Sequence, residues 1–195
     1  MNTTPSKLLI GWSEADTTPA GKVDLSGQYY HRIADGVHSR LSATALVFES
    51  DNAEAVVMVS LELVGFQADF QEAVRAKLRA ELPDLDAAKV FLNVTHTHNA
   101  PGVDLICGIG WLAELPEVLP AAEYRKFMLD KIVAVVSDAW RNRRPGGVAS
   151  GLASARVGHC RRAVYSDGTA EMYGCTGRED FIGMEGGEDS GVDLL

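Results

Sequence analysis

The chain has 195 residues, 46% of them hydrophobic and 23% charged, which is enough to bury a core of ordinary size. Its formal net charge of −9 argues against nucleic acid or an anionic membrane surface as a partner. No stretch approaches the ~20 apolar residues that span a bilayer, and the opening residues lack the pattern of a secretory signal. We therefore expect no nucleic-acid partner, no membrane span and a cytoplasmic location.

A strand and a β-hairpin are predicted in the first third of the chain. A short apolar strand is expected over residues 8–12. Residues 41–50 and 54–63 are expected to pair as a hairpin, because two strand-like segments flank a short polar turn. Alternate residues of the first hairpin strand share one face: Leu41, Ala43, Ala45 and Val47.

A helix and a further strand follow the hairpin. Between residues 67 and 82, apolar residues recur every four positions, which predicts an amphipathic helix that ends at Pro83. These apolar residues are Phe70, Val74, Leu78 and Leu82. The apolar run over residues 90–94 then predicts a buried strand. The order strand, helix, strand is typical of a right-handed parallel crossover with its helix packed on the sheet.

A long loop and a second helix come next. The apolar content of the loop over residues 99–120 predicts an ordered, partly buried lid. A helix is predicted over residues 121–141. Arg141, Arg143 and Arg144 lie at or just past its end, where positive charge suits the helix dipole. A solvated cap is favoured there over a phosphate site.

The remaining elements complete the prediction of the fold. Residues 148–157 predict a strand, and residues 161–174 predict a hairpin that turns at 166–168. Beyond residue 176 no completed element is predicted, and residues 192–195 resemble the start of a strand. The fold class is therefore α/β, a mixed β-sheet with packed helices in a layered α/β sandwich. Residues 1–195 are expected to form a single domain that is truncated at its C-terminal end.

Two histidines mark the leading candidate site. His96 and His98 follow the predicted strand and precede a Pro-Gly turn. In an extended chain, side chains two residues apart point to the same face, roughly 6–7 Å apart at their Cβ atoms. Neutral imidazoles suit two ligands of one metal, or one ligand beside one group that handles substrate. The alternative is that both histidines hydrogen-bond the backbone of a turn.

The cysteines and one serine offer weaker candidates. Cys107, Cys160 and Cys175 are widely spaced and form no CxxC pair, which favours free thiols over a disulfide framework or a zinc–thiolate set. A nucleophilic hydrolase that uses Ser60 or Cys107 is a further alternative. The sequence contains no GxSxG motif and no local histidine partner that would support it.

Four sequence blocks, in the expected order, resemble the neutral/alkaline non-lysosomal ceramidase family. They are GWSEADTTP (11–19), DGVHSRLSATALVFES with VVMVSLEL (35–50 and 56–63), VTHTHNAPG (94–102) and GHCRRAVY (158–165). The resemblance extends over about the whole chain, which corresponds only to the N-terminal half of a typical member. Residues 1–195 are therefore expected to be a ceramidase-like N-terminal domain.

The resemblance implies a zinc-dependent hydrolase of an N-acyl amide bond. It implies that His96 binds Zn²⁺, that His98 lies beside the substrate, and that Arg161 helps to hold the substrate. Arg162 is the adjacent alternative, because this chain has Cys-Arg-Arg where the family has Asn-Arg-Ser. The family's other zinc ligands and its reactive serine lie beyond residue 195. The ligand set of this chain is therefore expected to be incomplete unless a C-terminal part supplies the rest.

Three residues of the chain are of a type that could substitute for the missing zinc ligands. Glu62 ends a predicted strand near the sheet edge of His96, although a loop carboxylate is favoured. His38 and His159 are favoured as structural hydrogen-bonding residues. The expected partners are a small-molecule or lipid-amide substrate, and either a second copy of the chain or a missing C-terminal segment. The competing function is a non-catalytic domain that binds a ligand or partner chain.

Overall fold

The computed structural model describes residues 8–52, 54–104 and 115–195. The chain divides into two compact units, residues 1–147 and residues 148–195. Across the described ranges, no helix combines the length and the apolar character that a membrane crossing requires.

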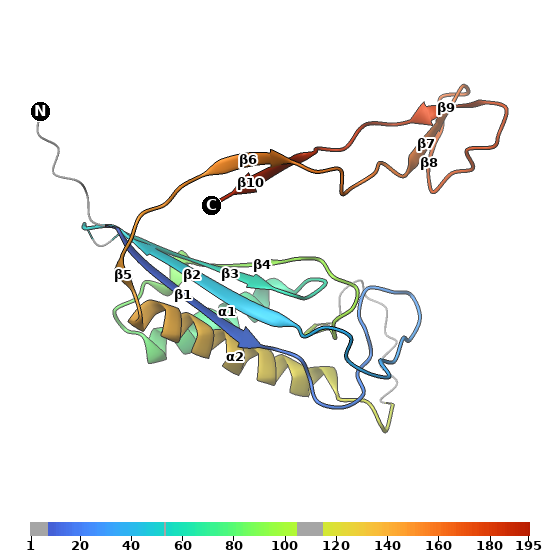
Figure 1. Cartoon of the computed structure of the whole chain (residues 1–195). Helices are drawn as coiled ribbons and strands as arrows, with labels where there is room; N and C mark the ends of the chain where they lie inside the picture. The colour runs from blue at the N-terminus through green and yellow to red at the C-terminus, as the bar shows by residue number, and fades with distance from the viewer. Residues whose placement is uncertain (1–7, 53, 105–114) are drawn as a thin grey trace, which may run out of the picture. The chain divides into compact units, whose positions relative to one another are not determined.

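The first unit is built on a five-stranded mixed sheet with two helices on one face (Figure 1). The strand order is β4–β3–β2–β1–β5. The strands are β1 (Leu9–Asp16), β2 (Ser42–Glu49), β3 (Ala55–Leu61), β4 (Val90–Val94) and β5 (Arg144–Pro145). β3 and β4 run parallel, and the other neighbours run antiparallel. The mixed α/β class, the hairpin and the parallel crossover are thus confirmed.

The helices follow the apolar periodicity of the sequence. They are α1 (Ala68–Glu81) and α2 (Ala121–Arg141), with a short 3₁₀ turn, η1 (Ala87–Lys89), before β4. In α1, the residues buried against the core are Phe70, Val74 and Leu78. α2 occupies the range predicted for it, and its buried stripe includes Tyr124, Met128 and Ile132. α1 therefore packs through the face that the sequence predicts, and α2 occupies its predicted range.

β1 is longer than the predicted strand, which covered only residues 8–12. The residues that alternate with its exposed side chains are Gly11, Ser13 and Ala15. A Cβ atom added to Gly11 would lie 1.9 Å from the backbone oxygen of Ala139 in α2. The backbone of α2 therefore crosses β1 almost in contact with it. The β1 side chains on this face are too small or too polar to produce the apolar alternation that predicts a strand.

The opposite face of the sheet carries a row of apolar side chains. Trp12, Leu46, Met58 and Phe91 are successive partners across β1, β2, β3 and β4. Trp12, Met58 and Phe91 are exposed. An apolar row therefore crosses four strands of this face.

Two arginines at the end of α2 are held by carboxylates. The Arg141 Nη2 atom lies 2.7 Å from Glu81 Oε1, and the Arg143 Nε atom lies 2.7 Å from Glu49 Oε2. The guanidinium of Arg143 also stacks 3.4 Å from the centre of the Trp140 ring. The Arg143 guanidinium also donates to the Trp140 carbonyl oxygen in the last turn of α2, which is a helix-capping contact.

Tyr124 joins the start of α2 to the end of β1. Its side chain is fully buried, and its hydroxyl donates to the Thr17 carbonyl oxygen at 3.0 Å. Burial raises the pKa of this hydroxyl, so it stays protonated as a donor. We expect Tyr124→Phe to lower the free energy of unfolding by about 1 kcal/mol, because the buried carbonyl loses a hydrogen bond.

Chemical denaturation measures this difference. Tyr29→Phe is the matched control, because Tyr29 is exposed. Equal unfolding free energies for the two variants would contradict a structural hydrogen bond at Tyr124.

The second unit contains two small sheets. β6 (Gly151–Ser154) pairs with β10 (Gly191–Leu194), and β7 (Arg162–Tyr165) lies between β8 (Ala170–Met172) and β9 (Phe181–Met184). The hairpin over residues 161–174 is confirmed as β7 and β8. At its turn, the Asp167 carboxylate accepts from the backbone N–H of Thr169 at 2.9 Å, and Gly168 adopts a φ of +82°.

Two predictions for this unit are wrong. The strand expected over residues 148–157 is limited to β6, and the segment after residue 176 forms β9 and β10. The start of a strand that was expected over residues 192–195 is confirmed, because it falls largely in β10. Tyr165 of β7 is buried, with the Arg178 guanidinium 3.7 Å from its ring centre and Phe181 at its edge.

Candidate functional site

The histidine pair lies just past the end of β4, in a segment that we call the histidine turn (residues 95–101). Its backbone still follows the neighbouring chain, because Thr95 N–H donates to the Leu61 carbonyl at 3.0 Å and Thr97 N–H to the Leu63 carbonyl at 3.2 Å. His96, however, has a φ of +58°, in the left-handed region that few residues other than glycine adopt. The extended geometry expected for this pair is therefore wrong at His96.

The two imidazoles nevertheless lie side by side. Their ring centres are 5.1 Å apart, the rings are inclined by 67°, and the two Nε2 atoms are 3.4 Å apart. His96 is exposed and His98 is half-buried. Backbone strain of this kind persists where the surrounding structure holds it, commonly at functional sites.

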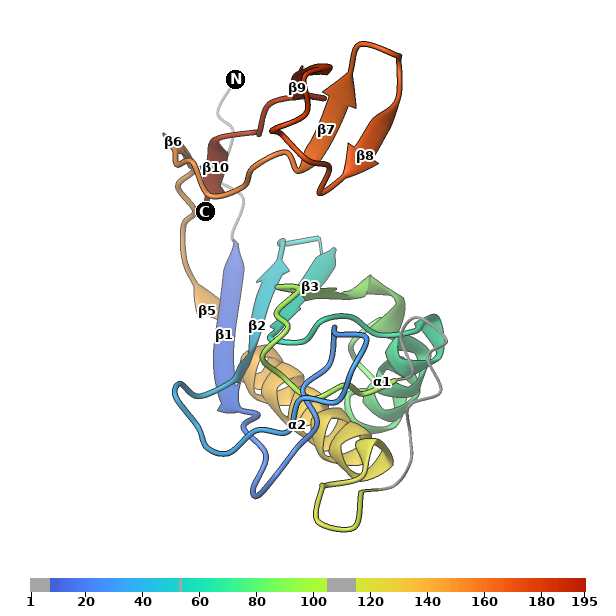
Figure 2. The ribbon, with the colours of Figure 1, turned by 90° about the vertical axis from the view of Figure 1, so that its right-hand side faces the viewer.

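A second segment, which we call the cover segment (residues 24–33), folds against the histidine turn (Figure 2). Leu25 forms a β-bridge with Pro101, and Ser26 N–H donates to the Ala100 carbonyl at 2.9 Å. The cover segment is closed at its base by a second bridge, between Asp24 and Ile33. Its conformation therefore determines what surrounds the histidines.

Three residues of the cover segment lie against His98. The Gln28 Nε2 atom lies 3.3 Å from His98 Nδ1. A Cβ atom on Gly27 would lie 2.6 Å from His98 Cγ, so only glycine leaves room for the ring. The Arg32 guanidinium donates to the His98 carbonyl oxygen and, at 3.1 Å, to Asn99 Oδ1. The sequence analysis missed these residues, because no motif or spacing links them to His98.

A carboxylate inside the cover segment orders the residues that reach the site. Asp24 accepts from the Arg32 backbone N–H at 3.0 Å, and its other oxygen lies 2.6 Å from His31 Nδ1. Both the Asp24 and the His31 side chain are partly exposed. His31 therefore belongs to the frame that positions Arg32.

The donor chemistry of the histidine pair fits part of a zinc site. Two nitrogen ligands of a tetrahedral zinc ion, each ~2.0–2.1 Å from it, lie roughly 3.3 Å from each other. The separation of 3.4 Å between the Nε2 atoms is close to that value, and it is also within reach of an N–H···N hydrogen bond. Across the described parts of the chain, no group of three His, Cys, Asp or Glu residues could hold a metal ion. The pair therefore fits as part of a ligand set.

Of the three substitute ligands, one is already engaged and the other two are exposed. The Glu62 carboxylate accepts from the Ser42 backbone N–H at 2.6 Å, as the favoured loop-carboxylate interpretation requires. His38 is exposed, and His159 is an exposed residue of the second unit.

Arg161 and Arg162 both lie in the second unit but have different neighbours. The Arg161 Nη1 atom donates to the Tyr173 hydroxyl at 2.6 Å, and its guanidinium lies 5.0 Å from the ring centre. Tyr173 has a φ of +58°. The Arg162 Nε atom instead lies 3.0 Å from a carboxylate oxygen of Glu185. Arg161 thus has a neutral partner and is the better candidate to contact a substrate oxygen.

Residues 8–166 match the family model described as neutral/alkaline non-lysosomal ceramidase, N-terminal. The chain belongs to this ceramidase family. Neutral ceramidase 1 of Arabidopsis thaliana is 27% identical over 152 residues, which cover 73% of this chain and 18% of that protein. The chain therefore spans less than a fifth of the length of this family relative.

Two solved ceramidase structures share the fold. Neutral ceramidase from Pseudomonas aeruginosa superposes with a TM-score of 0.66 at 23% identity, over 83% of this chain and 25% of that one. A ceramidase in complex with C2 gives a TM-score of 0.64 at 23% identity, over 82% and 24%. The fold of this chain thus matches about a quarter of each of these ceramidase chains. The family model over residues 8–166 confirms the predicted family resemblance.

Residues near both ends of the loop predicted over residues 99–120 are bonded to other parts of the first unit. The Asp104 carboxylate pairs with Arg125 of α2 and accepts from the Gln67 N–H at 2.8 Å, at the start of α1. At the other end, Leu119 N–H donates to the Lys22 carbonyl at 2.9 Å. The predicted lid falls largely on residues 105–114, which lie outside the described residues, as does Cys107. Cys160 and Cys175 are free thiols, as expected.

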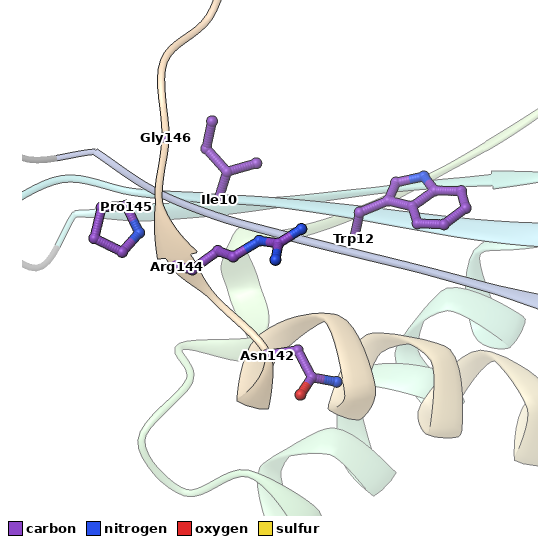
Figure 3. Close-up of a pocket in the computed structure, with 6 residues that line it drawn as sticks. All are labelled: Ile10, Trp12, Asn142, Arg144, Pro145 and Gly146. Atoms are coloured by element: carbon purple, nitrogen blue, oxygen red, sulfur yellow. The ribbon is translucent and has the colours of Figure 1, made fainter.

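A pocket of the first unit lies away from the histidine turn. It surrounds the pairing of β1 with β5, at the opposite edge of the sheet from β4 (Figure 3). Its lining consists of Ile10, Trp12, Asn142, Arg144, Pro145 and Gly146. None of the histidines contributes to it.

Proposed function

We propose that this ceramidase-family chain is the N-terminal part of a metal-dependent hydrolase that cleaves the N-acyl bond of a lipid amide. The observation that carries the proposal is the pair of Nε2 atoms, 3.4 Å apart on a strained turn at the end of a sheet strand. Family membership and the two ceramidases that share the fold support an amide as the substrate.

Each candidate residue has a separate role in this proposal. His96 is the proposed ligand of Zn²⁺. When bound, zinc polarises a carbonyl group and lowers the pKa of a bound water to about 7. His98 donates a hydrogen bond to the amide oxygen as negative charge develops on it. Arg161, which the family resemblance assigns to substrate binding, supplies a fixed positive charge for a polar group of the substrate.

A catalytic zinc site generally has three protein ligands. The described residues supply too few around His96, so the proposal includes ligands from a C-terminal part of the enzyme. The cytoplasmic location and self-association remain predictions from the sequence.

Binding of a labelled substrate tests this proposal on the chain itself. With saturating Zn²⁺, we expect saturable binding of a short-chain fluorescent ceramide, measured by anisotropy. His98→Ala and Arg161→Ala should each weaken binding about tenfold, the equivalent of ~1.4 kcal/mol for one lost hydrogen bond to a charged or polarised group. His38→Ala and His159→Ala are the matched controls, because both histidines are exposed, one in each unit.

The alternative function is a non-catalytic domain of the same fold that binds a ligand or partner chain. It is favoured by the apolar row of Trp12, Leu46, Met58 and Phe91 on the sheet face opposite the helices. Binding that persists after zinc is chelated, and that neither His98→Ala nor Arg161→Ala weakens, would overturn the hydrolase site and support this alternative.

A further inference from the structure

We propose that Gln28 is a positioning residue that keeps the single proton of neutral His98 on Nε2. This inference rests on the proposed function and deepens it. It makes His98 a hydrogen-bond donor toward the bound substrate and prevents it from acting as a second metal ligand.

The contact between Gln28 and His98 determines the position of the proton. The Gln28 amide nitrogen lies 3.3 Å from His98 Nδ1. An amide NH₂ group can only donate, so His98 Nδ1 must accept. A neutral imidazole carries one N–H, and the proton therefore resides on Nε2.

The proton on Nε2 divides the roles of the two histidines. His98 Nε2 faces His96 Nε2 at 3.4 Å. A nitrogen that carries a proton has no free lone pair for a metal ion, whereas it can donate to an oxygen. His96 is thus left as the ligand, and His98 faces the same point as a donor.

The cover segment also holds the His98 ring in place. Gly27, with a φ of +101°, lies so close that a Cβ atom would be 2.6 Å from His98 Cγ and 2.7 Å from Nδ1. Arg32 also donates to the backbone carbonyl of His98. The ring therefore keeps Nδ1 toward Gln28 and Nε2 toward His96.

His31 provides an internal contrast in the same segment. Its Nδ1 atom lies 2.6 Å from Asp24 Oδ2, and an ionised carboxylate can only accept. Neutral His31 must therefore carry its proton on Nδ1. His31 and His98 are therefore expected to adopt opposite tautomers.

Nitrogen NMR of the metal-free chain tests the inference directly. In protein labelled with ¹⁵N-histidine, at an alkaline pH where the imidazoles are neutral, we expect Nε2–H for His98 and Nδ1–H for His31. His98→Gln and His31→Gln assign the two signals. If wild-type His98 carries its proton on Nδ1, the amide presents its oxygen instead, and the inference is overturned.

The variant Gln28→Glu should reverse the tautomer of His98. A carboxylate at this position can only accept, so His98 should change to Nδ1–H while His31 stays unchanged. The Nε2 atom of His98, now without a proton, should then join His96 as a ligand. Zinc binding should become at least tenfold tighter, which is within the range of outer-shell effects on metal affinity. An unchanged His98 tautomer in this variant would refute the role of Gln28.

The two proposals can fail separately. The tautomer of His98 is measured without metal or substrate, so it does not depend on hydrolase activity. Zinc that binds equally well without His96 would end the proposed function and leave the tautomer result intact.

Discussion

Gly11→Ala is expected to destabilise the first unit by more than about 4 kcal/mol, or to prevent it from folding. The added Cβ would lie 1.9 Å from the Ala139 carbonyl oxygen and 2.9 Å from its carbonyl carbon. Both are backbone atoms of α2, so no side-chain rotation can relieve the overlap. α2 would have to move away from β1, and the buried side chains along it would lose their contacts with the sheet.

Chemical denaturation followed by circular dichroism measures the loss. Gly36→Ala is the matched control, because a Cβ there meets nothing within 4 Å and the residue lies in the same unit. The control is expected within about 0.5 kcal/mol of the wild type, as for most surface substitutions. A Gly11→Ala protein as stable as the control would show that α2 does not cross β1 at this point.

His96→Ala is expected to abolish zinc binding by the chain. The wild-type chain should bind zinc weakly, because the described residues offer no group of three donors that could hold the ion together with His96. Removal of His96 leaves one imidazole, whose Nε2 we expect to carry a proton. Isothermal titration and the metal content after dialysis measure the difference.

Two further variants separate ligand loss from misfolding. His38→Ala should retain the zinc affinity of the wild type, because His38 is exposed and belongs to the same unit. His96→Gly should lose zinc and be at least as stable as His96→Ala, because glycine adopts the φ of +58° without steric cost. Stoichiometric zinc in either His96 variant would show that the proposed ligand is wrong.

Much of the first unit was predictable because its signals are local. The four-residue period of Phe70, Val74 and Leu78 gave the buried face of α1, and alternation in β2 gave the residues that face the core. Each pattern arises because one helix or strand packs one of its faces against the core. The parallel pairing of β3 and β4 then follows from the order of the elements.

The elements that were missed depend on distant partners. The helix-facing side of β1 contains Gly11, Ser13 and Ala15, because α2 approaches too closely for large apolar side chains. β9 was not predicted, and its hydrogen-bonding partner is β7, on the far side of the β7–β8 hairpin. A pattern within a few residues cannot reveal either cause.

The candidate site shows the same division. The sequence by itself determined the family and the residues proposed to act, because His96, His98 and Arg161 lie in motifs readable along the chain. The tertiary structure alone decided the left-handed turn at His96 and the contact of Gln28 with His98. These two residues are 70 positions apart, so folding and not local spacing brings the amide to the imidazole and determines which ring nitrogen keeps the proton.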